Sequence, residues 1–199
     1  MTRARTCKLA RFTFPGLALV VGLTLAGAGV AAGNDGTGLN YIVPVAAGSA
    51  EDPSMRPFLP PSLSMSDGTN MPLPLAHFRG AVLLINFWAT WCVPCIKEMA
   101  FLDRLQGDLK GMPIQVIPLS EDKGGLPVAK GFITRQKLTF LRPYTDPGAA
   151  AAQMLNVTGL PTSFIVDKQG RLVQKVEGPF EWDSPPIVQR FRDLINESP

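Results

Sequence analysis

Histidine and cysteine are scarce in this chain of 199 residues, which has one histidine, His77, and three cysteines. Two of the cysteines, Cys92 and Cys95, are separated by two residues, a spacing found in zinc sites and in haem attachment sites. A structural zinc site needs a second pair of ligands, and only Cys7 and His77 are left to supply it. Covalent haem attachment needs a histidine directly after the second cysteine, where this chain has Ile96. The sequence therefore predicts no metal site, and no cofactor other than the cysteine pair itself.

Charged residues are also few, at 18% of the chain, and the net charge is only +3. Four basic residues lie at the extreme N-terminus, namely Arg3, Arg5, Lys8 and Arg11, so the rest of the chain is close to neutral. No basic stripe remains for nucleic acid, and the sequence predicts no such partner. With 46% hydrophobic residues and no pattern of a second core, the length fits one globular domain with an extension.

The extension begins with an uncharged interval between Arg11 and Asp35 that is rich in Leu, Val, Ala and Gly. A basic flank followed by such a stretch is typical of a signal peptide and of a single membrane anchor. Small residues around Ala26–Ala28 suit cleavage, whereas the length of the stretch suffices to span a bilayer. We interpret residues 1–33 as a signal-anchor or a signal peptide. Either interpretation exports the domain, which stays anchored by residues 12–33 or becomes soluble after cleavage.

Residues 34–58 are predicted to form a flexible linker. They are rich in Gly, Pro, Ser and Ala and contain few large side chains, so they cannot bury enough apolar surface to fold alone. The folded domain is therefore expected to span residues 59–199, and the linker would let it stand off the membrane.

A dense apolar run from Val82 to Trp88 predicts a strand buried on both faces. From Pro94 onward, apolar residues recur at helical spacing at Met99, Leu102 and Leu105. The tetrapeptide Cys-Val-Pro-Cys between these segments therefore straddles the N-terminus of a helix.

That position favours redox chemistry at the cysteines. Free amide N–H groups and the helix dipole stabilise a thiolate, so we expect the pKa of Cys92 to lie below that of a free cysteine. Cys92 is the candidate nucleophile, and Cys95, one turn on and facing inward, is the candidate resolving cysteine that closes a Cys92–Cys95 disulfide. Pro94 lies in the first turn, where a helix tolerates proline, and stiffens the motif. On spacing alone, an inert structural disulfide is the alternative.

Around this motif, strand-like and helix-like segments alternate, which predicts a parallel-sheet core with right-handed crossovers. A short hairpin is expected first, across the turn Asp67–Asn70, and a final antiparallel hairpin across the turn Asp167–Gly170. Further strands are expected at 114–119, 139–144, 162–166 and 171–176, and further helices at 128–137, 149–155 and 187–195.

Three segments resemble the thioredoxin superfamily, and within it the TlpA/ResA/CcmG-like branch, with the TlpA-like members nearest. They are Asn86–Met99 with its Trp-Cys-Val-Pro-Cys motif, Gly159–Asp167, and Gly178–Asp183. The resemblance covers the chain from about Leu59 to the C-terminus. It implies an α/β thioredoxin-like fold, a central mixed sheet flanked by helices, with an N-terminal β-hairpin and a central helix–strand insertion.

The same resemblance implies a cis peptide bond between Leu160 and Pro161, facing the cysteines and holding an extended substrate segment by strand addition. Trp91 and Pro94 would contribute to this substrate-binding surface. An ordinary trans proline that begins a strand is the alternative for Pro161.

A buried aspartate lies under the motif in thioredoxin itself, and the matching position here is Asn86, which cannot take a proton. Glu98, three residues after Cys95, matches a glutamate that ResA-like and CcmG-like proteins keep near their cysteines. Our hypothesis is that Glu98 tunes the thiol pKa values and transfers the proton when Cys95 attacks. The alternative is a solvated residue in the first turn of a helix, where glutamate is favoured in general.

The resemblance implies a periplasmic thiol:disulfide reductase that a membrane thiol donor keeps reduced and that acts on the cysteines of respiratory metalloproteins. Copper-site assembly in cytochrome oxidase is the favoured role, and reduction of apocytochrome c for haem attachment is the alternative. A redox-inactive binding module built on the same fold is a third interpretation. A peroxidase is disfavoured, because the peroxiredoxin pattern puts threonine three residues before the cysteine and Thr90 stands two before Cys92.

Overall fold

The computed structural model describes residues 41–43, 52–69 and 71–198. The predicted signal or anchor segment, residues 1–33, and much of the predicted linker lie outside these ranges. Among the described residues, no helix has both the length and the apolar character needed to cross a membrane.

A mixed sheet forms the centre of the described domain, with the strand order β1-β8-β7-β4-β5-β6. Its strands are β1 (Tyr41–Val43), β4 (Val82–Trp88), β5 (Ile114–Ser120), β6 (Tyr144–Thr145), β7 (Thr162–Val166) and β8 (Leu172–Glu177). The β4, β5 and β6 strands run parallel, whereas β7 is antiparallel to both β4 and β8. A separate hairpin pairs β2 (Ser64–Met65) with β3 (Leu73–Pro74).

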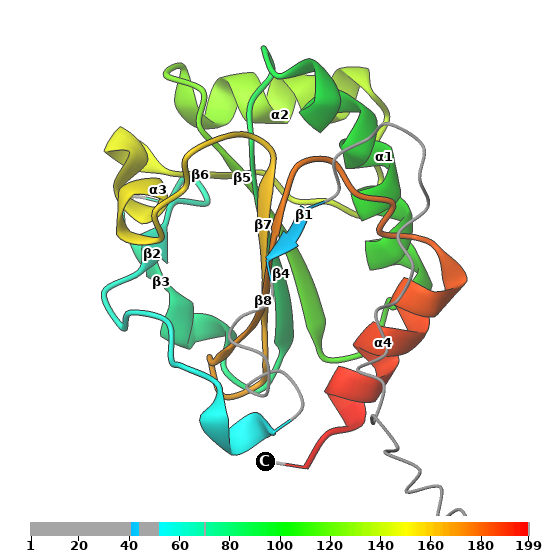
Figure 1. The fold of residues 1–199 in the computed structure, drawn as a ribbon. Helices are drawn as coiled ribbons and strands as arrows, with labels where there is room; N and C mark the ends of the chain where they lie inside the picture. The colour runs from blue at the N-terminus through cyan, green and yellow to red at the C-terminus, as the bar shows by residue number, and fades with distance from the viewer. Residues whose placement is uncertain (1–40, 44–51, 70, 199) are drawn as a thin grey trace, which may run out of the picture. The chain divides into compact units, whose positions relative to one another are not determined.

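The helices cover both faces of this sheet (Figure 1). They are α1 (Val93–Asp108), α2 (Gly125–Arg135), α3 (Ala150–Met154) and α4 (Pro185–Asn196), with short 3₁₀ turns at Pro53–Met55, Leu75–Phe78 and Pro147–Ala149. Every residue of β4 is buried, and alternate side chains enter two different cores. Val82, Leu84 and Trp88 join residues of α1, α2 and α4, whereas Leu83, Ile85 and Phe87 join the hairpin and α3. Period-two alternation on a strand covered on both faces explains its continuous apolar sequence.

The predicted fold class is confirmed, including the N-terminal hairpin and the flanked mixed sheet. The β7 strand spans the predicted residues, and α2 begins three residues earlier than expected and ends two residues earlier.

The strand predicted at residues 139–144 is wrong for all but its last residue, because β6 begins at Tyr144. The reason is a competing acceptor on α1. The buried carboxylate of Asp103 accepts the backbone N–H groups of Thr139, Phe140 and Leu141 at 2.8–3.1 Å. These N–H groups therefore bond to a side chain and not to a neighbouring strand.

The end of the predicted linker makes contacts with the domain. Leu172 N–H donates to the Pro57 carbonyl, Phe58 forms a β-bridge with Arg171, and the side chain of Arg56 is buried. Within the described residues, packing on the domain thus begins ahead of Leu59, the expected boundary.

Candidate active site

Cys92 and Cys95 form a disulfide at the N-terminus of α1, with their Cα atoms 5.3 Å apart. Cys92 is the N-cap residue, and its Sγ accepts the Cys95 N–H at 3.3 Å. Cys92 keeps 6% of its surface exposed and Cys95 1%. The helix N-terminus is thus directed at the sulfur of Cys92, an arrangement that stabilises negative charge there once the disulfide is reduced.

A groove of about 750 Å³ opens beside Cys92. Trp91, Val93 and Pro94 line it from the α1 side, and Leu160 lines it from the loop that precedes β7. Its remaining lining residues are Glu121, Ala149, Ala152, Gln153, Val157, Thr158 and Gly159. Trp91 is 68% exposed, so the rim of the groove offers an aromatic surface to a partner.

The structure brings four of the residues predicted for the site, Trp91, Cys92, Pro94 and Leu160, to the wall of one groove. The Leu160–Pro161 peptide bond is cis, so the alternative of a trans proline is wrong. Pro161 itself is buried and is not among the residues that line the groove.

Glu98 lies on the inner side of α1, away from the groove, with only 1% of its surface exposed. Its carboxylate accepts hydrogen bonds from the indole N–H of Trp182 and, at 3.4 Å, from the amide of Asn86. The Asn86 amide also donates to Ser163 Oγ at 2.9 Å. Burial raises the pKa of Glu98 to about 7, although these hydrogen bonds oppose the shift. The interpretation of Glu98 as a solvated helix residue is therefore wrong.

Sequence reasoning missed Glu121, an acidic residue in the groove itself. Burial and the neighbouring charge of Asp146 raise the pKa of Glu121 to about 8. Asp146 in turn accepts the N–H groups of Ala151 and Ala152, at 2.9 and 2.8 Å, at the start of α3. A signal for Glu121 did exist, since it directly follows β5, and ligands bind outside the carboxyl ends of parallel strands.

Trp182, whose indole faces Glu98, was also given no role from the sequence. It belongs to the segment Gly178–Asp183, which was noted only as part of the family resemblance. Its ring is fully buried against Phe180 and Phe191. Among the described residues, no three His, Cys, Asp or Glu side chains converge to hold a metal ion.

The chain matches the Redoxin family model over residues 53–190. It is 34% identical over 119 residues to the thiol-disulfide oxidoreductase ResA of Bacillus thuringiensis, a match that covers 59% of this chain and 67% of that protein. It is 32% identical over 142 residues to the thiol:disulfide interchange protein HelX of Rhodobacter capsulatus, covering 71% and 74%.

Solved structures show the same fold. A thiol:disulfide interchange protein of the thioredoxin family from Chlorobium tepidum superposes with a TM-score of 0.55 at 26% identity, covering 68% of this chain and 96% of the other. A secreted thiol-disulfide isomerase from Corynebacterium glutamicum superposes with a TM-score of 0.61 at 22% identity, covering 73% and 90%.

Proposed function

Because the chain belongs to the Redoxin family, in the branch of the thioredoxin superfamily that contains ResA and HelX, we propose that this thiol-disulfide oxidoreductase works as an exported reductant of protein disulfides. Its clients are proteins with cysteine pairs, and the electrons pass through Cys92 and Cys95. The observation that carries the proposal is the placement of Cys92, which caps α1 at the wall of an open groove while Cys95 lies buried behind it.

The reaction follows from this placement in two exchanges. In the first, the Cys92 thiolate attacks one sulfur of a client disulfide bound in the groove, and the other client sulfur leaves and takes up a proton. In the second, Cys95 loses its proton and attacks Cys92 Sγ, so that the mixed disulfide breaks and the second client sulfur leaves and takes up a proton. The client has gained two electrons and two protons, and the enzyme holds the Cys92–Cys95 disulfide seen in the structure.

Glu98 is the proposed acceptor of the proton that Cys95 loses. Cys95 and Glu98 are three residues apart on α1 and so share a face of the helix, and both are buried. With a pKa of about 7, Glu98 exchanges protons readily at neutral pH.

The proposed clients are proteins of respiratory metal-centre assembly. The TlpA-like character of the motif and of Gly178–Asp183 supports the cysteines of the oxidase copper site as the first candidate. The similarity to ResA and HelX supports apocytochrome c as the second candidate. In both cases we propose a periplasm-facing location and a membrane thiol donor that regenerates the dithiol, since an oxidising compartment returns no electrons to a reductase.

The reduction potential of the pair tests the direction of transfer. The full-length protein is equilibrated with glutathione buffers, and the fraction of dithiol is read by trapping free thiols. A potential near or below that of thioredoxin, roughly −270 mV, supports a reductase. A potential near roughly −120 mV, as in strong oxidants, contradicts it and assigns the protein to disulfide formation.

A Cys95→Ser variant identifies the client and tests the alternative of a binding module. It retains Cys92 but cannot complete the second exchange, so the mixed disulfide with the client accumulates. Oxidised copper-site and apocytochrome c peptides, offered in equal amounts, compete for this trap. A variant that traps neither peptide, yet supports respiration as well as the parent, assigns the chain to redox-inactive binding.

A further inference from the structure

The residues that lead into Cys92 form a tight turn. Cys92 N–H donates to the Ala89 carbonyl at 3.1 Å, which makes Thr90 and Trp91 the two central residues. This turn joins the end of β4 to the start of α1, and it presents the exposed Trp91 at the rim of the groove. The conformation of the turn therefore sets where Cys92 stands relative to the helix N-terminus.

One carboxylate, from the loop that follows β5, holds the turn. Asp122 Oδ2 accepts the Thr90 backbone N–H at 3.0 Å, and Asp122 Oδ1 accepts the Thr90 hydroxyl at 2.7 Å. The carboxylate also accepts the Ser120 hydroxyl at 2.9 Å, and the Asp122 N–H donates to Ser120 Oγ at 3.2 Å. Both oxygens of Asp122 are thus engaged, and each holds Thr90 by one bond.

The sheet explains why these residues meet. The β4 and β5 strands are parallel neighbours in which Trp88 pairs with Ser120, so both strands end at the same edge. Thr90 lies two residues past the end of β4, and Asp122 lies two residues past the end of β5. Hydrogen bonds to an ionised carboxylate are about twice as strong as those between neutral groups. The turn is therefore tied to the sheet as well as to the helix that follows it.

We propose that Asp122 is a positioning residue for the thiol exchange, which fixes the Thr90–Trp91 turn and so holds Cys92 as the N-cap of α1. The inference rests on the role proposed above for Cys92 as the attacking thiol. Without the carboxylate, the Thr90 N–H and hydroxyl lose their acceptor and the turn relaxes. Cys92 then leaves the position in which the helix N-terminus stabilises its thiolate, and its pKa rises.

Three variants of the full-length reduced protein distinguish the hydrogen bonds that position the Thr90–Trp91 turn from the negative charge of the Asp122 carboxylate. Asp122→Ala removes both bonds to Thr90, and Thr90→Val removes only the bond to the hydroxyl. Asp122→Asn removes the charge, but its amide still offers an acceptor to the Thr90 N–H and a donor to the hydroxyl oxygen. Asp108→Ala is the matched control, because Asp108 is an exposed aspartate at the far end of α1.

The measurement is the pH profile of Cys92 alkylation, with thermal melts run in parallel. We expect the midpoint to rise by about one pH unit in Asp122→Ala, by less in Thr90→Val, and to stay close to the parent in Asp122→Asn and Asp108→Ala. Asp122→Ala and Thr90→Val both act on the hydrogen bonds between Thr90 and the Asp122 carboxylate. The midpoint of the double variant should therefore rise no further than that of Asp122→Ala alone.

A parental midpoint in Asp122→Ala or in Thr90→Val overturns the proposal, whatever happens to the melting temperature. An Asp122→Asn shift as large as that of Asp122→Ala also overturns it, since the charge and not the position would then matter. If Asp122→Ala does not fold, Thr90→Val decides. The pH profile of alkylation reports on Cys92 whether the protein reduces or oxidises its clients. A reduction potential that contradicts the proposed reductase therefore leaves this test of Asp122 unaffected.

Discussion

Glu98 is a buried carboxyl group one helical turn beyond the resolving cysteine, and it accepts hydrogen bonds from Trp182 and Asn86. When ionised, it opposes the formation of a thiolate nearby, since two like charges in a buried site repel each other. We therefore expect Glu98→Gln to lower the pKa of Cys95 by roughly one unit. The same variant should slow the second exchange, because the proton acceptor is gone. The alkylation profiles of both cysteines and the decay of a trapped mixed disulfide measure the two effects.

Glu181→Gln makes the same chemical change at an exposed position and should leave both profiles unchanged. If Glu98→Gln titrates as the parent does and resolves mixed disulfides at the parental rate, Glu98 takes no part in the proton transfer.

The individual site residues that could be predicted are those whose signal is local. Cys92, Cys95 and Pro94 are read from one tetrapeptide at a strand–helix junction. The burial of Glu98 could not be read in this way, because Trp182, which covers it, lies 84 residues further along the chain. Glu121 and Asp122 were missed for a related reason, since it is the pairing of β5 with β4 that brings them to the cysteines.

At the scale of elements, the contact between α1 and residues 139–141 replaces a strand. The Asp103 carboxylate accepts three backbone N–H groups from this segment. Asp103→Ala removes the acceptor of all three donors. Leu141 is buried, and an unsatisfied buried group costs on the order of 1–3 kcal/mol, whereas Thr139 and Phe140 are exposed and their donors lose less. We expect the free energy of unfolding to fall by about 3 kcal/mol, as measured by urea denaturation.

Asp108→Ala, on the same helix but exposed, should change the unfolding free energy by less than about 0.5 kcal/mol. Equal stability of Asp103→Ala and the parent would mean that water replaces the carboxylate at no cost.

Residues 139–143 also show a limit on predicting strands from local sequence. Runs such as Ile114–Ser120 and Thr162–Val166 are buried on both faces, and composition alone identifies them as strands. Residues 139–143 were predicted as a strand in the same way, but the N–H groups of residues 139–141 bond to a side chain from a distant helix. Local sequence cannot show which of two acceptors a backbone segment will find.

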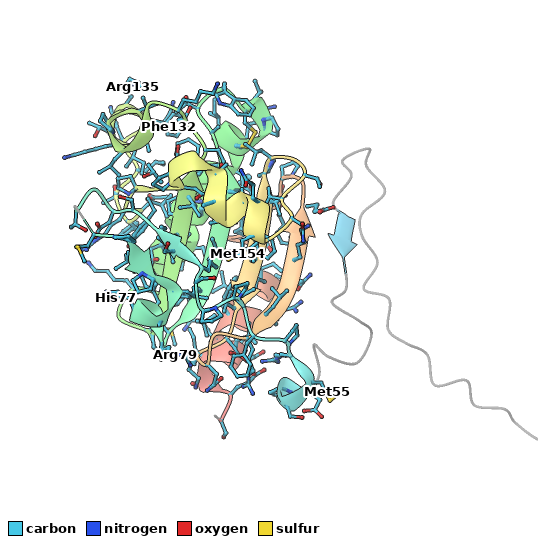
Figure 2. All side chains as sticks on the ribbon, turned by 90° about the vertical axis from the view of Figure 1, so that its left-hand side faces the viewer. Met55, His77, Arg79, Phe132, Arg135 and Met154 are labelled. Atoms are coloured by element: carbon cyan, nitrogen blue, oxygen red, sulfur yellow. A yellow bond between two sulfur atoms is a disulfide. The ribbon has the colours of Figure 1, made fainter. Side chains whose placement is uncertain are left out.

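At the scale of the whole domain, Arg56 joins three distant parts of the chain. Its guanidinium lies 2.6 Å from the Glu197 carboxylate, which follows α4, and 3.5 Å from Asp167, which follows β7. Figure 2 shows the neighbouring Met55 at the opposite end of the sheet from Phe132 and Arg135 of α2. The contact therefore fastens residues predicted to be linker to the end of the domain away from α2.

Arg56→Ala should lower the free energy of unfolding by about 3 kcal/mol, because it leaves the buried Asp167 with Arg171 as its ion-pair partner among the described residues. Urea denaturation of the variant beside Arg135→Ala, which removes an exposed arginine, measures the difference. If Arg56→Ala loses no more unfolding free energy than Arg135→Ala, the ion pairs of Arg56 with Glu197 and Asp167 only offset the cost of removing these charges from water.

The two raised carboxyl pKa values set how stability depends on pH. Glu98 has its pKa raised from 4.5 to about 7, and Glu121 has its pKa raised from 4.5 to about 8. Between these limits the folded protein holds protons that the unfolded chain releases. Stability must then fall as pH rises, since unfolding is favoured wherever the unfolded state binds fewer protons. Below about pH 4.5 both states are protonated, and above about pH 8 both are ionised, so the loss is confined to the interval between.

We therefore expect the parent to be less stable at pH 8 than at pH 5, with Glu98 accounting for up to about 3 kcal/mol of the difference. Glu98→Gln should remove about half of the slope below pH 7, because Glu98 and Glu121 each release about one proton on unfolding in that range. Glu98→Gln/Glu121→Gln should remove the rest, whereas Glu181→Gln should keep the parental curve. Urea denaturation across this pH range measures the slopes. If the unfolding free energy of the parent is instead constant from pH 5 to pH 8, both carboxyl groups ionise at their ordinary pKa in the folded protein, because water reaches them. Glu98 would then be no proton acceptor at neutral pH.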